Sequence, residues 1–314
     1  AGEKASKTQQ TGIEAAHKSA VEKMGGEIAA KAIAKKNKGK VILEDGVQKS
    51  KLKPKEKAAY NLAVRVAEKT GVNIRLYSGM KEYGKYNPET GEIMLNINAY
   101  SKGHSMMVFT LSHELVHMAK KWSPAEFKAF AEYLLEQYGK KGVSVEALIK
   151  AQMDNAVENG YTIDEHVAYE EVIADACERM LLDSDALAKM YGYKLKNPSK
   201  WQQILDVITE FITKIRSLFE GAEADSEEAK LYESLDEESK KFLENQFVKM
   251  VMDAGEHQAT IQNAFGKGTV VEVNENGEFT LAKGEDSNGA TKFLYNAFTW
   301  KTGGRETLSA ALKA

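Results

Sequence analysis

Residues 112–117 read Ser-His-Glu-Leu-Val-His and lie within a stretch, Met106 to Trp122, that is predicted to be helical. On a helix, residues four apart lie one above the other, so His113 and His117 can direct their imidazole nitrogens at one point. Glu114 is turned about 100° around the helix axis from His113, which puts its carboxylate beside that point. This His-Glu-x-x-His spacing predicts a zinc ion held by the two imidazoles.

The opposite side of this helix is apolar and is expected to pack into a core. The residues on that side are Val108, Leu111, Leu115 and Met118. The alternative is a chance match on an ordinary amphipathic helix with two hydrogen-bonded histidines. Because the chain has only 6 His, two of them at ligand spacing around a glutamate favour the metal site.

The composition is that of a soluble globular protein of 314 residues, with 43% hydrophobic and 28% charged residues. Its net charge of −3 indicates no particular polyanionic partner. The single cysteine, Cys177, excludes an internal disulfide framework and a cysteine-based structural zinc site. No apolar run approaches the roughly 18 residues of a membrane span, and no secretory signal opens the chain. We therefore expect a cytoplasmic location, with a secreted form after signal removal as the alternative.

The part of the chain before the motif predicts a small sheet in the order strand, helix, strand, hairpin strand. Strand signals cover Val41–Glu44, Val72–Tyr77 and Glu92–Ile97, and a helix is expected from Pro54 to Thr70. Residues 86–91 predict a turn. An edge strand beside the motif helix could bind an extended peptide by strand addition, and Leu95 to Ala99 is the candidate for that edge, although an ordinary hairpin strand fits equally well.

A catalytic zinc site usually has a third protein ligand. The metzincin solution is absent, because Lys120 stands at its glycine position and Ser123 at its histidine position. A later helix offers Glu171 as ligand, with Asp175 one turn on to hold the ring N–H of His113. Asp175 lies in an otherwise apolar run, which argues against a merely solvated acidic face. The alternative third ligands are Glu170, His166 and Asp175.

With these residues, the chain resembles the gluzincin (thermolysin-like) metallopeptidases over roughly residues 75–190. The resemblance rests on His-Glu-x-x-His and on a following Glu-x-x-x-Asp. It implies that His113, His117 and Glu171 bind zinc, that Glu114 is the general base, and that Asp175 supports the first histidine. The chain departs from the compact pattern, because 53 residues separate His117 from Glu171 and leave room for two inserted helices. The Lys-rich opening also resembles metallopeptidase domains carried in large proteins of bacterial mobile elements or phages.

The expected fold is therefore α+β, a zincin-like domain with a small mixed sheet, the motif helix and a mostly helical second half. We expect a polar tail or linker over 1–40, the metallopeptidase domain over 41–195, a helical extension over 196–260, and a β-hairpin with a C-terminal tail over 261–314. Residues 199–219 carry a strong apolar stripe, for which burial against residues 226–253 is favoured over a membrane surface. The basic run 31–40 is interpreted as a solvated linker, since it lacks interleaved aromatic residues.

The implied activity is zinc-dependent hydrolysis of a protein or peptide substrate, with Glu114 moving the proton. A second group usually stabilises the oxyanion, and Tyr161 and His257 are the candidates, ahead of Tyr169 and His166. Two other classes remain as alternatives: a zinc-containing interaction module without hydrolysis, and a nucleic-acid-associated accessory protein that uses residues 31–57. Cys177 is expected to be a buried, inert thiol.

Overall fold

The computed structural model describes residues 39–44, 46–79, 82–98, 100–101, 104–195, 198–220 and 226–265, and three strands between 269 and 299. The chain divides into two compact units, of which one spans Lys38–Gly255 and the other contains Ala1–Asn37 and Glu256–Ala314. Residues 1–38 of the predicted tail, with most of its basic run, and the last fifteen residues lie outside the described part. The Lys38–Gly255 unit combines the expected domain 41–195 with most of the expected extension 196–260.

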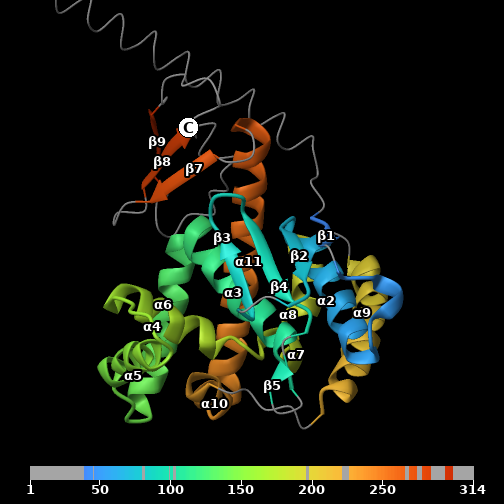
Figure 1. The fold of residues 1–314 in the computed structure, drawn as a ribbon, viewed down its shortest axis with the longest axis horizontal. Helices are drawn as coiled ribbons and strands as arrows, with labels where there is room; N and C mark the ends of the chain where they lie inside the picture. Colours follow the sequence, from blue (N-terminus) through green and yellow to red (C-terminus); the bar gives the residue numbers. More distant parts are fainter. Residues whose placement is uncertain are drawn as a thin grey trace, which may run out of the picture. The chain divides into compact units, whose positions relative to one another are not determined.

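This unit is α+β, as the sequence predicts, and is mostly helical around a small mixed sheet (Figure 1). The strands are β1 (Val41–Leu43), β2 (Asn73–Tyr77), β3 (Gly84–Asn87) and β4 (Glu92–Asn96), in the order β1-β2-β4-β3. Pairs β1/β2 and β2/β4 are parallel, and β3 runs antiparallel to β4. Two shorter strands, β5 (Tyr100–Ser101) and β6 (His104–Ser105), pair with each other.

The predicted edge at Leu95 to Ala99 is wrong. Leu95 and Asn96 belong to β4, which pairs with β2 on one side and with β3 on the other. Most of β4 is buried on both faces of the sheet, as is typical of an interior strand. The edge is instead β3, formed by residues that include the start of the predicted turn.

Two helices pack against these strands and place the motif. Helix α2 (Pro54–Thr70) packs on β1 and β2, and α3 (Met106–Trp122) packs on β3 and β4. The two helices also contact each other. Helix α3 has the predicted bounds, and the residues of its predicted apolar side are all buried: Val108, Leu111, Leu115 and Met118.

A 3-10 turn, η1 (Lys49–Lys51), precedes α2, and further helices follow α3. They are α4 (Pro124–Lys140), α5 (Val145–Glu158), α6 (Glu165–Ala176), α7 (Met180–Asp183), α8 (Ala186–Gly192), α9 (Pro198–Leu218), α10 (Glu227–Glu233) and α11 (Glu237–Phe265). Between α6 and α7 the chain leaves the α-helical conformation. Here the Leu181 N–H donates to Ser112 Oγ, and the Asp175 carbonyl accepts the Glu178 N–H and lies 3.3 Å from Ser226 Oγ.

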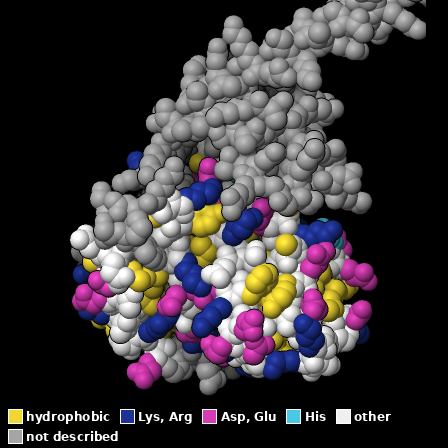
Figure 2. All heavy atoms as spheres, turned by 180° about the vertical axis from the view of Figure 1, so that it is seen from behind, with side chains coloured by type: hydrophobic (Ala, Val, Ile, Leu, Met, Phe, Trp, Pro, Cys, Tyr) yellow, Lys and Arg dark blue, Asp and Glu magenta, His cyan; other side chains and the backbone are white. Residues whose placement is uncertain are grey.

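Helix α9 packs on α2, α7 and α8, and its apolar stripe is buried at Ile208, Ile212, Ile215 and Phe219. Burial is thus confirmed at these positions, whereas Val207 and Leu218 are exposed, and the contacts with α2, α7 and α8 differ from the predicted packing against residues 226–253. None of the helices in the described part of the chain is long and apolar enough to cross a membrane. Where the surface in Figure 2 is coloured, basic and acidic side chains alternate over it and do not gather by sign.

The other unit contains an antiparallel sheet of β7 (Thr269–Val273), β8 (Glu278–Lys283) and β9 (Leu294–Thr299). Strands β7 and β8 form the predicted hairpin. Strand β9 was not predicted; it pairs with β8 through a register shift at Phe279/Thr280.

Candidate metal centre

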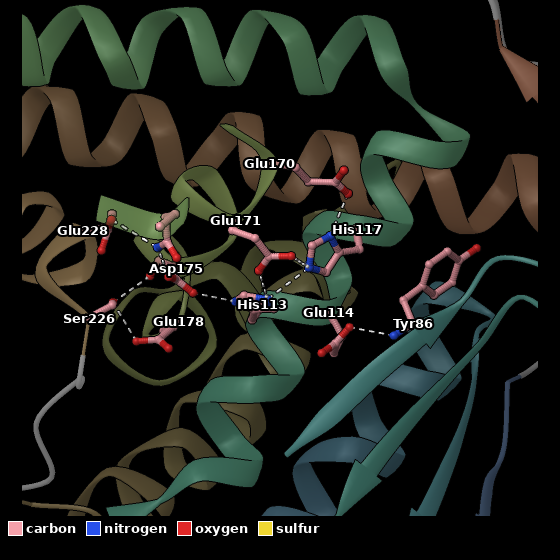
Figure 3. A network of polar contacts seen from close by, with 11 residues as sticks. Tyr86, His113, Glu114, His117, Glu170, Glu171, Asp175, Glu178, Ser226 and Glu228 are labelled. Atoms are coloured by element: carbon pink, nitrogen blue, oxygen red, sulfur yellow. Dashed lines mark hydrogen bonds and ion pairs between the residues drawn. The ribbon is translucent and has the colours of Figure 1, made fainter. Parts of the chain in front are cut away.

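Helices α3 and α6 pack against each other and bring the two sequence motifs together. Helix α6 begins at the N-cap Asp164, whose carboxylate accepts the Val167 N–H. Its small and apolar residues are buried: Ala168, Val172, Ile173, Ala174 and Ala176. The half-buried Glu170, Glu171 and Asp175 lie beside the two histidines of α3 (Figure 3).

His113, His117 and Glu171 form a group that could hold a metal ion. The two histidine Nε2 atoms are 3.0 Å apart, and the Glu171 carboxylate lies 3.2 Å from His113 Nε2 and 3.7 Å from His117 Nε2. Tetrahedral ligands at zinc distances are separated by about 3.3 Å. The spacing of these three donors therefore fits one small ion.

The outer nitrogens of both rings are already bonded to carboxylates. His113 Nδ1 lies 2.9 Å from Asp175 Oδ1, and His117 Nδ1 lies 2.6 Å from Glu170 Oε1. Because a carboxylate accepts a hydrogen bond, each neutral ring carries its proton on Nδ1 and directs the lone pair of Nε2 inward. Two lone pairs and a carboxylate then face one another, and a cation bound between them would satisfy all three.

The contacts also distinguish Glu171 from its alternatives. Both oxygens of Glu170 are engaged, one by His117 and the other by Lys120, so Glu170 supports a ligand. Asp175 belongs to a second possible donor group with His113 and Glu178, but its Oδ1 accepts from His113 Nδ1, as predicted for a supporting residue.

Glu114 lies on the other side of α3, toward the edge strand. It is buried, and its Oε2 accepts the Tyr86 N–H at 2.6 Å (Figure 3). Strand β3 can approach α3 because residue 84 is glycine. A Cβ at Gly84 would lie 2.3 Å from Cγ2 of Thr110, far inside van der Waals contact.

Burial raises the pKa of the Glu114 carboxyl, although the two histidines and the Tyr86 N–H act in the opposite direction. Burial also raises the pKa of Glu171, but the hydrogen bond to His113 and the nearby imidazoles lower it overall. For His113, burial lowers the pKa, while Asp175 and Glu171 outweigh that effect and raise it well above its usual range. The carboxylates around His113 thus favour a positive charge at that ring.

A polar network behind Asp175 was not found by sequence reasoning. Gln152 Nε2 of α5 lies 2.6 Å from Asp175 Oδ2 and 3.2 Å from Glu228 Oε1. Ser226 Oγ lies 2.8 Å from Glu178 Oε2, to which its single hydrogen is donated, and 3.3 Å from the Asp175 carbonyl oxygen. These contacts join residues up to 76 positions apart, so spacing along the chain gives no sign of them.

The oxyanion candidates are not brought to the centre by any described contact. Tyr161 lies on the connection between α5 and α6 with 56% of its side chain exposed. His257 is buried on the part of α11 that belongs to the other unit. Their role stays a prediction. Tyr169 is half-buried, and Cys177 is buried with its thiol pKa raised by burial, as expected for an inert cysteine.

Comparison of the chain with models of protein families, with curated proteins and with solved structures found no match. The assignment of the centre therefore rests on its own chemistry. Two imidazole nitrogens and a carboxylate are the ligands typical of a catalytic metal ion with an open coordination position. The residues present fit such an ion.

Proposed function

We propose that this protein is a zinc-dependent endopeptidase of gluzincin type, with a zincin-like fold in the Lys38–Gly255 unit. The observation that carries the proposal is the convergence of His113 Nε2, His117 Nε2 and Glu171, with both outer ring nitrogens held by carboxylates. His113, His117 and Glu171 would hold the zinc ion. When bound, zinc supplies Lewis acidity that activates water near neutral pH and polarises a carbonyl.

Glu114 would move the proton. Its carboxylate accepts a proton from the attacking water and then delivers it to the leaving amine. The Tyr86 N–H fixes one carboxylate oxygen, and burial keeps bulk water away from it. Glu114 therefore acts as general acid and base beside the metal ligands without being one of them.

The edge strand supports a peptide as substrate. Strand β3 pairs only with β4 within the described sheet, and the Tyr86 N–H points away from β4 toward Glu114. A substrate in extended conformation could add along this edge and so bring one of its carbonyls beside Glu114. The strand-addition mode expected from the sequence is thus retained, with β3 in place of Leu95 to Ala99.

The test is Glu114→Gln in the full chain, with Glu132→Gln on the exposed face of α4 as a matched control. We expect both variants to bind zinc like the wild type, measured by metal analysis and by absorption at the zinc edge. Cleavage of a peptide library should fall about 10²–10⁴-fold in Glu114→Gln, because the general base is removed, and stay unchanged in the control. Undiminished cleavage by Glu114→Gln would exclude this mechanism. An iron absorption edge in place of a zinc edge would show that the bound metal is iron and not zinc, since the same ligand set also suits Fe(II).

A further inference from the structure

The chain between His117 and Glu171 is longer than the metal site requires, and part of it returns to the site. Helix α5 packs on α6 and buries only Leu148 and Ala156. It also makes a polar contact with the centre: Gln152, which is half-buried, reaches the carboxylates of Asp175 and Glu228.

We infer that Gln152 is a positioning residue for the metal centre, which holds Asp175 in the orientation that fixes the His113 ring. This inference rests on the metal site of the proposed function. Asp175 uses Oδ1 for His113 Nδ1 and Oδ2 for Gln152 Nε2, so both of its oxygens are held. A carboxylate held at both oxygens cannot turn, and the imidazole that donates to it keeps its tautomer and direction.

The direction of the hydrogen bonds in this network is determined by its acceptors. Asp175 accepts from His113, and it can therefore only accept from Gln152. The amide nitrogen of Gln152 carries two hydrogens, one for Asp175 and one for Glu228. Glu228 is buried, so its contact with Gln152 is also protected from water. Gln152 thus links the metal-binding pair of helices to α5 and α10.

Removing the amide tests the inference directly. Gln152→Leu keeps a similar volume and loses both donors, and Met153→Leu, at the neighbouring half-buried position, is the matched control. We expect Gln152→Leu to weaken zinc binding roughly three- to tenfold, somewhat less than loss of a residue that touches a ligand directly. Zinc affinity would be measured on the full chain by competition with a chromogenic chelator. Met153→Leu should leave the affinity unchanged.

A double substitution tests the direction of the hydrogen bonds. In Asp175→Asn, the new amide nitrogen faces the amide nitrogen of Gln152. If Gln152 turns to present its oxygen, that oxygen faces the Glu228 carboxylate. Adding Glu228→Gln removes this conflict, because the turned oxygen can accept from both new amides. We expect Asp175→Asn to weaken zinc binding roughly 10–100-fold, Glu228→Gln alone to change it less than twofold, and the double variant to regain about threefold over Asp175→Asn.

The outcomes separate this inference from the proposed function. Unchanged zinc affinity in Gln152→Leu, with melting temperatures lowered equally with and without zinc, would show a merely structural residue and overturn the inference. If the variant with both Asp175→Asn and Glu228→Gln binds zinc no better than Asp175→Asn alone, Gln152 does not donate to the two carboxylates as inferred. Zinc binding that responds as expected in a protein that cleaves no peptide would contradict only the proposed function. A wild-type chain that binds no zinc would contradict both.

Discussion

Helix α3 is flanked by two elements that act on its polar side chains in different ways. On one side, α6 supplies side chains: Glu171 completes the metal-binding group, and Glu170 and Asp175 hold the two imidazoles. On the other side, β3 supplies backbone: the Tyr86 N–H holds Glu114, and the missing side chain of Gly84 allows the approach.

This difference separates two tasks of the site. The α6 side collects carboxylates, whose charge favours a cation. The β3 side adds one neutral donor on an edge strand of the sheet, which suits proton transfer and the backbone of a substrate. Changes on the α6 side should therefore alter metal binding first, and changes on the β3 side should alter turnover while the metal stays bound.

The largest effect is expected for Glu171→Gln, which removes a carboxylate ligand from the α6 side. Structural zinc sites bind with about 10–16 kcal/mol, so one ligand in four corresponds to about 2.5–4 kcal/mol, or a loss of roughly a hundred- to a thousandfold. Glu170→Gln is the matched change at the neighbouring residue, and we expect only about a tenfold loss there, because Glu170 holds His117 without being a ligand. Chelator competition measures both affinities. If Glu170→Gln lost zinc while Glu171→Gln retained it, Glu170 would be the metal ligand and Glu171 would not.

The second prediction concerns the β3 side. Gly84→Ala places a Cβ against Cγ2 of Thr110 and should push β3 away from α3. We expect stability to fall by about 1–3 kcal/mol, as in other overpacked sites, and peptide turnover to fall roughly tenfold as the Tyr86 N–H leaves Glu114. Zinc affinity should change less than twofold.

Thr110→Ser removes the clashing methyl group, so Gly84→Ala combined with Thr110→Ser should regain most of both losses. Urea unfolding and peptide hydrolysis measure the two effects. The comparison between the two sides fails if zinc affinity falls in parallel with turnover, since α3 would then be displaced as a whole.

The two sides also differ in how far the sequence predicts them. The α6 side follows from helix periodicity, with spacings of three, four and seven residues. These spacings predicted the bounds of α3 and its buried apolar side. They also predicted Glu171 in the metal-binding group and the contact of Asp175 with His113. The β3 side depends on backbone pairing. Gly84 and Tyr86 belong to a short segment without apolar alternation, next to a strong turn signal, so the sequence indicates β4 and not its partner.

Contacts between distant elements were beyond sequence reasoning for another reason. Ser226 contacts Asp175 near the end of α6, Ser112 accepts the Leu181 N–H, and Gln152 donates to the Asp175 carboxylate. Such side chains have no periodicity that marks them, because the tertiary packing alone decides which polar groups meet. Glu170 was predicted only in part. Its position next to Glu171 made it a candidate ligand, and only its contact with His117 Nδ1 shows that it holds a ligand instead.

The smallest expected effect tests charge on the α6 side. Lys120 pairs with Glu170 one turn after His117, and 27% of its side chain is exposed. Lys120 has two opposing effects: it steadies Glu170, which helps His117, and it places a positive charge near the cation. A partly exposed ion pair contributes at most about 1 kcal/mol to positioning. The repulsion acts on a doubly charged ion, and so we expect it to be the larger effect.

Lys120→Met should therefore tighten zinc binding about two- to fivefold at low ionic strength, while Lys120→Arg, which keeps the charge, should leave it nearly unchanged. The gain should shrink as salt rises from about 0.01 M to about 0.15 M, because the Debye length falls from roughly 30 Å to roughly 8 Å. Chelator competition at both ionic strengths measures it. If Lys120→Met instead weakens zinc binding at every salt concentration, Lys120 acts chiefly by positioning Glu170, and the α6 side resembles the β3 side in depending on orientation more than on charge.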